Sequence, residues 1–108
     1  MNHGYIESFR NTDLVWHFQW LVNGAKPEDF DTALGFFRFG KDGAMIDEYP
    51  LDKVDDLSAF RLKIPSIRNN YYPGTYEFSV TVEPPFGEEG TYEVLAKGLL
   101  VINEESPA

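Results

Sequence analysis

The chain contains no cysteine among its 108 residues. This absence excludes disulfides, thiol nucleophiles, zinc sites built on thiolates, and iron–sulfur clusters. Basic residues are also scarce, because nine Lys and Arg stand against eighteen Asp and Glu, which gives a formal net charge of -9. Binding to the phosphate backbone of nucleic acids or to anionic membranes requires clusters of Lys and Arg side chains. We therefore expect neither nucleic acid nor a membrane as a partner.

Long hydrophobic runs are missing as well. The longest apolar stretches, residues 16–22 and 99–102, are too short or too polar to span a bilayer, and residues 1–5 lack the pattern of a signal peptide. We expect a protein that is made and used in a cytoplasm, or in something assembled there. The length fits one domain over residues 1–108, with ends that fray near 1–4 and 104–108.

The aromatic content, by contrast, is high at 16%, which suits strands better than helices. Residues 14–23 and 74–83 alternate with a period of two, as half-buried strands do. The first segment places five apolar side chains on one face: Leu14, Trp16, Phe18, Trp20 and Val22. The second places four there: Tyr76, Phe78, Val80 and Val82. His17, Thr81 and the other alternate residues are expected to face water.

Further segments predict more strands. Residues 60–64 form a short strand that Pro65 closes, and residues 33–39 and 44–46 form a hairpin around the turn 41–43. Residues 91–103 are apolar on both faces, and Gly98 suggests a bulge or a close backbone approach that divides this strand in two. Helical spacing occurs only over residues 51–57 and 66–70, in connectors.

Strands at intervals of about 8–12 residues with turn signals between them predict an all-β fold. We expect an immunoglobulin-like antiparallel β-sandwich with one or two short helical turns in its connectors. Dispersed acidic side chains on the outer faces protect such a fold against edge-to-edge aggregation. The predicted core consists of eight side chains: Trp16, Phe18, Trp20, Phe37, Leu62, Phe78, Val80 and Val101.

Catalytic motifs are absent from the sequence. It has no nucleophile elbow, no phosphate-binding loop and no His-Glu-x-x-His, and its two histidines, His3 and His17, lack a positioned partner. Two acidic loops could hold Ca²⁺, but without the spacing of an EF-hand they are better interpreted as solvated. Their carboxylates are Glu28, Asp29 and Asp31 in one loop, and Asp52, Asp55 and Asp56 in the other. We predict no enzyme, no cofactor and no metal.

Aromatic residues in predicted loops are the candidate partner contacts: Tyr71, Tyr72 and Phe86. Such side chains can stack on sugars or anchor a partner protein. The alternative is structural, since a tyrosine near a strand corner often packs inward and bonds nearby backbone. For Tyr72 and Tyr76 we favour this structural interpretation, whereas for Phe86 both remain open.

The order of motifs resembles the small immunoglobulin-like domains of tailed-bacteriophage virion proteins, such as the amino-terminal domain of baseplate upper proteins. The resemblance runs from about Arg10 to Asn103 and rests on the order of five features. They are the aromatic strand after residues 10–13, the turn and acidic connector of residues 23–31, the two strands around the turn 40–43, the stretch 72–78 with its Pro-Gly-Thr-Tyr, and the late segment 98–102. It implies a structural role, without cofactor or catalytic residues.

These observations favour a non-catalytic structural or interaction protein. We expect an accessory phage virion protein, for capsid decoration or for a neck, tail or baseplate, that docks onto other virion proteins or onto itself. No small-molecule ligand is expected. Two alternatives remain: a carbohydrate-binding module that uses Tyr71, Tyr72 or Phe86, and a small acidic inhibitor of a cytoplasmic enzyme.

Overall fold

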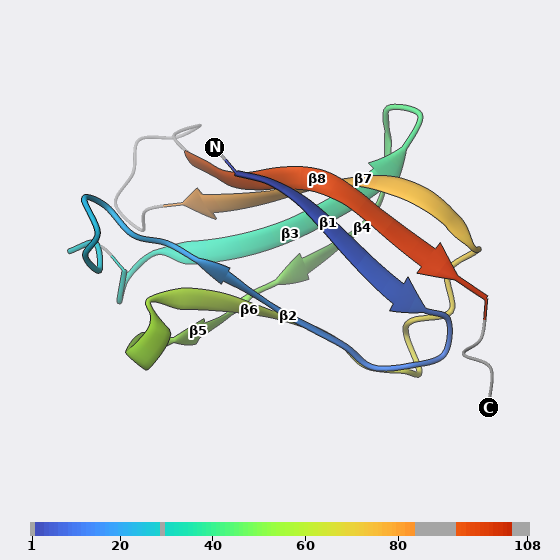
Figure 1. Ribbon diagram of the computed structural model, residues 1–108, viewed down its shortest axis with the longest axis horizontal. Coiled ribbons are helices and arrows are strands. Elements are labelled where there is room, and N and C mark those ends of the chain that lie inside the picture. Colours follow the sequence, from blue (N-terminus) through green and yellow to red (C-terminus); the bar gives the residue numbers. More distant parts are fainter. Residues whose placement is uncertain (1, 29, 84–92, 105–108) are drawn as a thin grey trace.

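The computed structural model describes residues 2–28, 30–83 and 93–104, and its strands form two facing sheets (Figure 1). One sheet has the order β1-β8-β7-β3-β4 and the other the order β2-β6-β5. The elements are β1 (Asn2–Phe9), β2 (Leu14–Gln19), β3 (Leu34–Lys41), β4 (Ala44–Pro50), β5 (Asp52–Val54), a 3-10 turn η1 (Asp55–Leu57), β6 (Ala59–Ile64), β7 (Gly74–Glu83) and β8 (Glu93–Asn103). The predicted all-β sandwich is confirmed.

The strand order follows that of immunoglobulin domains, in which a sheet containing strands B, E and D faces a sheet containing C, F and G. Here β2-β6-β5 corresponds to the first set, and β3-β7-β8 to the second. One pairing differs from the antiparallel arrangement that we expected, because β1 runs parallel to β8. The chain passes from β1 in the larger sheet to β2 in the smaller one, and β1 thereby lies beside the last strand instead of beside β2.

Strand β1 is an element that the sequence pattern does not predict. Residues 2–4, expected to fray, belong to it and pair in register with Ala96, Lys97 and Gly98. A Cβ on Gly98 would lie only 1.9 Å from the carbonyl oxygen of Gly4, so Gly98 permits a close backbone approach. The predicted division of the last strand at Gly98 is wrong, because β8 is one strand from Glu93 to Asn103. Its irregularity lies at Leu95, which is skipped where Val80 pairs with Ala96 and Thr81 with Val94.

The alternation of residues 74–83 predicts the inner face of β7 correctly, since its four apolar side chains are all buried. Thr81 is an exception on the other face, because it is only 5% exposed and accepts a 2.7 Å hydrogen bond from Arg38 Nη1. The hairpin is also confirmed, with positive φ of 54° at Asp42 and 82° at Gly43, as a type I′ turn requires. Strand β6 ends before Pro65, as predicted.

Two members of the predicted core are wrong. Trp16 is 40% exposed although Leu14 and Phe18 on either side are buried, because β2 is the edge strand of its sheet and its inward face lies at the border of the sandwich. Val22 is predicted on the same apolar face but not in the core, and it is likewise 49% exposed, beyond the end of β2. Val101 is on the outer face of β8, whose buried residues are Ala96, Leu100 and Ile102. His17 faces outward and is exposed, as expected.

The two segments with helical spacing do not form α-helices. Residues 51–57 contain the short strand β5 and the single 3-10 turn η1, which ends at Ser58 with a left-handed φ of 48°. Residues 66–70 contain one turn, in which the N–H groups of Arg68 and Asn69 donate to the carbonyl of Pro65. No helix among the described residues is long and apolar enough to cross a membrane.

Candidate functional site

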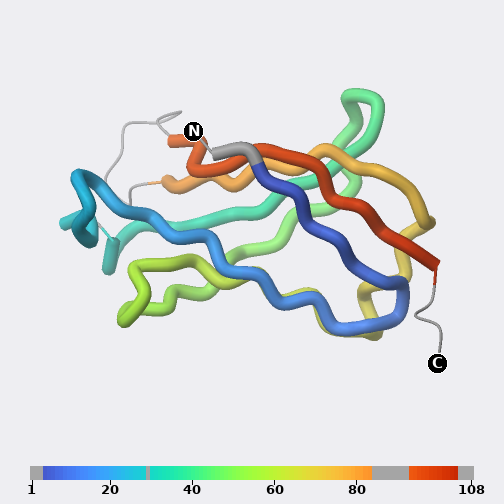
Figure 2. The backbone as a smooth tube through the Cα atoms, in the orientation of Figure 1, coloured from blue at the N-terminus to red at the C-terminus, as the bar shows by residue number. Residues whose placement is uncertain are grey.

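The connector between β6 and β7, residues 65–73, is held against the turn that joins β1 to β2 (Figure 2). The side chain of Asn69 is 1% exposed, and its Nδ2 lies within donating distance of three acceptors. These are Ser8 Oγ at 3.0 Å, the Phe9 carbonyl at 3.1 Å and the Thr12 carbonyl at 2.8 Å. A single buried amide therefore joins the two segments.

Three more hydrogen-bonded links tie the same segments together. The N–H of Asn11 donates to the Asn69 carbonyl at 2.7 Å, and the N–H of Ser66 donates to Asp13 Oδ1 at 2.6 Å. The guanidinium of Arg10 reaches the carbonyl of Asn70 at 3.3 Å. Because backbone and side-chain groups on both sides take part, this end of the sandwich is pre-organised.

Two large side chains project from this pre-organised connector. Ile67 is 84% exposed and Tyr72 is 82% exposed, the two highest values among the large hydrophobic side chains of the described residues. The structural interpretation of the Tyr72 side chain is therefore wrong. Apolar side chains on a rigid loop bind a partner with little ordering cost, which is the arrangement found at interaction hot spots.

The structural interpretation of Tyr76 is confirmed. Its ring is buried at the start of β7, and its hydroxyl donates a 2.5 Å hydrogen bond to the carbonyl of Tyr72. This is the tyrosine corner of immunoglobulin-like sandwiches, in which a tyrosine at this strand bonds the backbone a few residues upstream. The backbone of Tyr72 is thus fixed while its ring remains exposed.

The other candidate in this connector, Tyr71, is half-buried, and its side chain makes contacts within the molecule. Its ring meets Phe39 edge-on at 4.9 Å, and its hydroxyl donates to Asp47 Oδ2 at 2.6 Å while also contacting the hydroxyl of Tyr49. Arg68 lies with Nη2 3.6 Å from Asp47 Oδ2 and with its guanidinium over the Tyr49 ring at 4.6 Å. This polar cluster links the connector to β4.

The cluster raises the pKa values of its two tyrosines, Tyr49 and Tyr71, and lowers the pKa of Asp47. Burial, followed by the hydrogen bond to the Asp47 carboxylate, raises the pKa of Tyr71 far above its ordinary value. Burial also raises the pKa of Asp47, but the hydrogen bonds from Tyr71 and from the Glu48 N–H, together with the charge of Arg68, outweigh it. The pKa of Asp47 therefore lies below its ordinary value. At neutral pH the cluster holds an anionic Asp47 and neutral tyrosines.

The structure brings together only part of the predicted contact set. Tyr71 and Tyr72 share one connector, whereas Phe86 lies outside the described residues. Sequence reasoning missed Ile67, because an isolated apolar residue in a predicted helical turn is expected to pack inward. The only feature of the sequence that indicates an exposed Ile67 is the run of polar residues from Arg68 to Asn70, because these residues offer no apolar neighbour for it to pack against.

The acidic loops are bridged by lysine. Lys26 Nζ lies 3.5 Å from a carboxylate oxygen of Asp31 and 3.5 Å from one of Asp55, and Lys53 Nζ donates to the Asp31 carbonyl at 2.6 Å. Asp29 lies outside the described residues. In the described part of the chain, no group of three or more His, Asp or Glu side chains is arranged to hold a metal ion.

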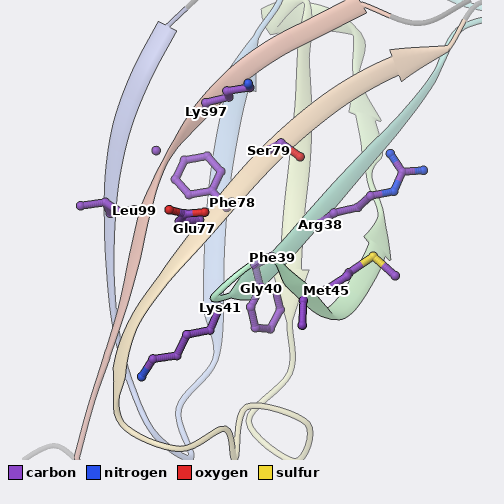
Figure 3. A pocket seen from close by; sticks show the side chains of 13 residues that line it. Arg38, Phe39, Gly40, Lys41, Met45, Glu77, Phe78, Ser79, Lys97 and Leu99 are labelled. Carbon is purple, nitrogen blue, oxygen red and sulfur yellow. The ribbon is translucent and has the colours of Figure 1, made fainter.

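A second surface feature is an open hollow of about 720 Å³ on the outer face of the larger sheet, where β3 carries no side chain at Gly40. Figure 3 shows Met45 and Leu99 on opposite sides of it, with Glu77 between. Arg38 also lines the hollow but is already paired with Glu48 at 3.0 Å. The lining combines basic, acidic and apolar side chains, and it does not indicate one class of ligand.

The fold is shared with solved structures that include a phage domain and a bacterial protein. The N-terminal domain of ORF48 of phage TP901-1 has a TM-score of 0.63 at 14% identity, over 95% of this chain and 89% of that chain. A protein titled "putative glycoside hydrolase", from Bacteroides vulgatus, has a TM-score of 0.56 at 9% identity over 94% of this chain, which spans only 17% of that protein's length. No family model and no curated protein matches the sequence. At these identities the likeness is one of fold, and the fold is shared with a domain of a phage protein.

Proposed function

We propose that this protein is a non-catalytic interaction module, and that it docks as a structural component onto a larger phage assembly. The observation that carries the proposal is the exposure of Ile67 and Tyr72 on a connector that hydrogen bonds hold in place. The fold shared with the N-terminal domain of phage TP901-1 ORF48, over most of both chains, supports placing that assembly in a phage particle.

The docking surface is defined by the two exposed side chains of the connector, Ile67 and Tyr72. Arg10, which bonds the carbonyl of Asn70, borders it. An aliphatic and an aromatic anchor bordered by a cation suit a partner surface that offers apolar pockets and carboxylates. The net charge of -9 on the whole chain favours a basic or mixed partner through long-range steering.

The test is co-sedimentation of the tagged full chain with phage or prophage particles from its own host. We expect the protein to sediment with particles, and expect Ile67→Asp with Tyr72→Ala to abolish this while circular dichroism remains unchanged. The matched control is Leu57→Ser, which changes a side chain of 52% exposure on η1, at a different connector. Absence of the protein from all particles, or equal loss with the control, contradicts the proposal.

A second candidate function is carbohydrate binding. It is favoured by the exposed ring of Tyr72, which can stack on a sugar face, and by the fold shared with the "putative glycoside hydrolase". A glycan array followed by titration of Tyr72→Ala separates the two functions. Binding that depends on Tyr72 supports this candidate, and a silent array removes it.

A further inference from the structure

The edge strands of the two sheets differ in how they are protected against pairing with another strand. Natural edges are blunted by bulges, prolines, side chains that cap the backbone, or short length. Strand β4 has a register shift, ends at Pro50, and carries an Asp47 carboxylate that accepts the Glu48 N–H at 2.9 Å. Strand β5 has three residues and β2 has six. Strand β1 has eight residues in unbroken register with β8, without a bulge or a proline. Its one charged side chain in the described part of the chain is Glu7, and the Asn69 side chain covers only its last carbonyl, at Phe9.

The direction of the free backbone groups of β1 follows from its neighbours. In a parallel pair, alternate residues point both N–H and C=O toward the partner strand. The N–H of Arg10 donates to Asn103 at the end of β8, and the carbonyl of Phe9 is turned to the opposite side, where Asn69 reaches it. Tyr5 and Glu7 therefore direct their N–H and C=O groups away from β8. No described residue outside β8 is strand-paired with β1 (Figure 1).

We propose that two copies of this protein associate by antiparallel pairing of β1 with β1, about a two-fold axis at Ile6. In this register Tyr5 of each copy lies opposite Glu7 of the other as a hydrogen-bonded pair. All four outward backbone groups of these two residues are then satisfied in each copy. The two larger sheets become one continuous sheet.

The side chains of β1 are self-complementary in this register, which is why a second copy is the occupant. Tyr5 is 56% exposed, and its hydroxyl donates to Glu7 Oε2 at 3.3 Å within the strand. Across the two-fold axis, the phenol of Tyr5 in each copy faces the carboxylate of Glu7 in the other copy, so this donor–acceptor pair occurs twice. Ile6 is 1% exposed and already packed in the core, so the pairing requires no rearrangement of the sandwich.

Charge gives the association a distinctive dependence on salt. Each copy carries a net charge of -9, so the two copies repel each other, and the bonds across the axis are between neutral groups or between a phenol and a carboxylate. Screening weakens the repulsion more than it weakens these contacts. Association is therefore expected to strengthen as ionic strength rises, the opposite of an interface held by ion pairs.

The test is sedimentation velocity on the full chain across a concentration series. We expect a dimer, and expect Glu7→Pro to raise its Kd at least about tenfold, because proline removes an outward N–H and leaves the bonds to β8 intact. The matched control is His17→Pro, which removes an outward N–H from the edge strand β2 and is expected to leave the dimer unchanged. A chain that remains monomeric up to about 1 mM overturns the proposal.

A charge exchange keeps the proposal falsifiable if a proline variant fails to fold. Tyr5→Glu places two carboxylates opposite each other on both sides of the axis and is expected to raise the Kd at least about tenfold. Adding Glu7→Arg restores an attractive pair and is expected to restore the dimer. If Tyr5→Glu leaves the Kd of the dimer unchanged, or if His17→Pro raises it as much as Glu7→Pro does, another surface is used and the proposal is overturned.

Discussion

At the scale of single residues, three phenylalanines occupy the centre of the sandwich. Phe37 of β3 stacks on Phe18 of β2 at 6.0 Å and on Phe78 of β7 at 5.2 Å. In antibody domains the corresponding strands carry a tryptophan packed against a disulfide that joins the sheets. Here aromatic packing takes the place of that disulfide, which explains how a sandwich without cysteine joins its two layers.

Replacement of Phe37 tests this account. Phe37→Ala removes a fully buried ring in contact with both sheets and is expected to lower the free energy of unfolding by about 3–5 kcal/mol. Phe36→Ala is the matched control, because Phe36 precedes Phe37 in β3 and is only partly buried on the other face. Urea unfolding measures both, and a loss for Phe37→Ala no larger than that of the control contradicts the account.

Residue-scale chemistry also predicts the response of the protein to acid. Because the pKa of Asp47 is lower in the folded state than its ordinary 3.8, its contribution to stability is complete above that value and is lost as pH falls through the folded pKa. We expect Asp47→Asn to unfold with less dependence on pH below about 4 than the parent chain. Urea midpoints measured from neutral pH down to about pH 3 provide the test. Parallel curves for the two chains contradict it.

At the scale of elements, β1 shows why a strand can escape sequence analysis. Its inward positions include Gly4, Ile6 and Ser8, so only one of them is a large apolar residue. The alternation that identifies β7 is therefore absent, although β1 is paired along its whole length. What positions β1 is the contact between Gly4 and Gly98, which are far apart in the sequence.

Replacement of Gly98 tests how β1 is held. Gly98→Ala places a Cβ against the backbone of Gly4, so we expect β1 to detach from β8 and the free energy of unfolding to fall by about 1–3 kcal/mol. Hydrogen exchange should show faster exchange at Ile6 and Ser8, whose N–H groups face β8. The control is Leu99→Ala, at an exposed neighbour in the same strand. Unchanged exchange in Gly98→Ala would falsify this view of the contact.

At the scale of the whole molecule, the acidic excess is spread over many segments and not gathered into one site. Most ion pairs among the described residues join exposed side chains, and exposed pairs contribute little to stability. Eighteen acidic residues against nine basic ones leave a net repulsion within the folded chain. The excess therefore serves solubility and edge protection better than it serves stability.

Ionic strength tests this view of the charge. Salt screens the repulsion, so we expect the thermal midpoint to rise between about 0.01 M and about 1 M NaCl at low protein concentration. Glu28→Lys with Glu104→Lys changes two exposed positions and lowers the magnitude of the charge from -9 to -5, since each replacement adds two positive charges. This variant is expected to show a smaller rise. An equal rise in both proteins would mean that repulsion is not the cause.

The sequence by itself determined the all-β class, the hairpin at Asp42 and the inner face of β7, because these depend on local alternation and turn chemistry. It also predicted that the ring of Tyr76 packs inward, but it predicted the same for Tyr72, whose ring is exposed. The charge and the lack of cysteine likewise needed no structure. All of these follow from neighbours within a few residues.

Only the tertiary structure determined which side chains reach the surface and which strands lie at the edges. Trp16 obeys the alternation and is nevertheless exposed at an edge, while Tyr71 and Tyr72 are adjacent and have opposite surroundings. The amide of Asn69 and the contact between Gly4 and Gly98 join segments separated by most of the chain. Burial and pairing depend on such distant neighbours, and no local pattern encodes them.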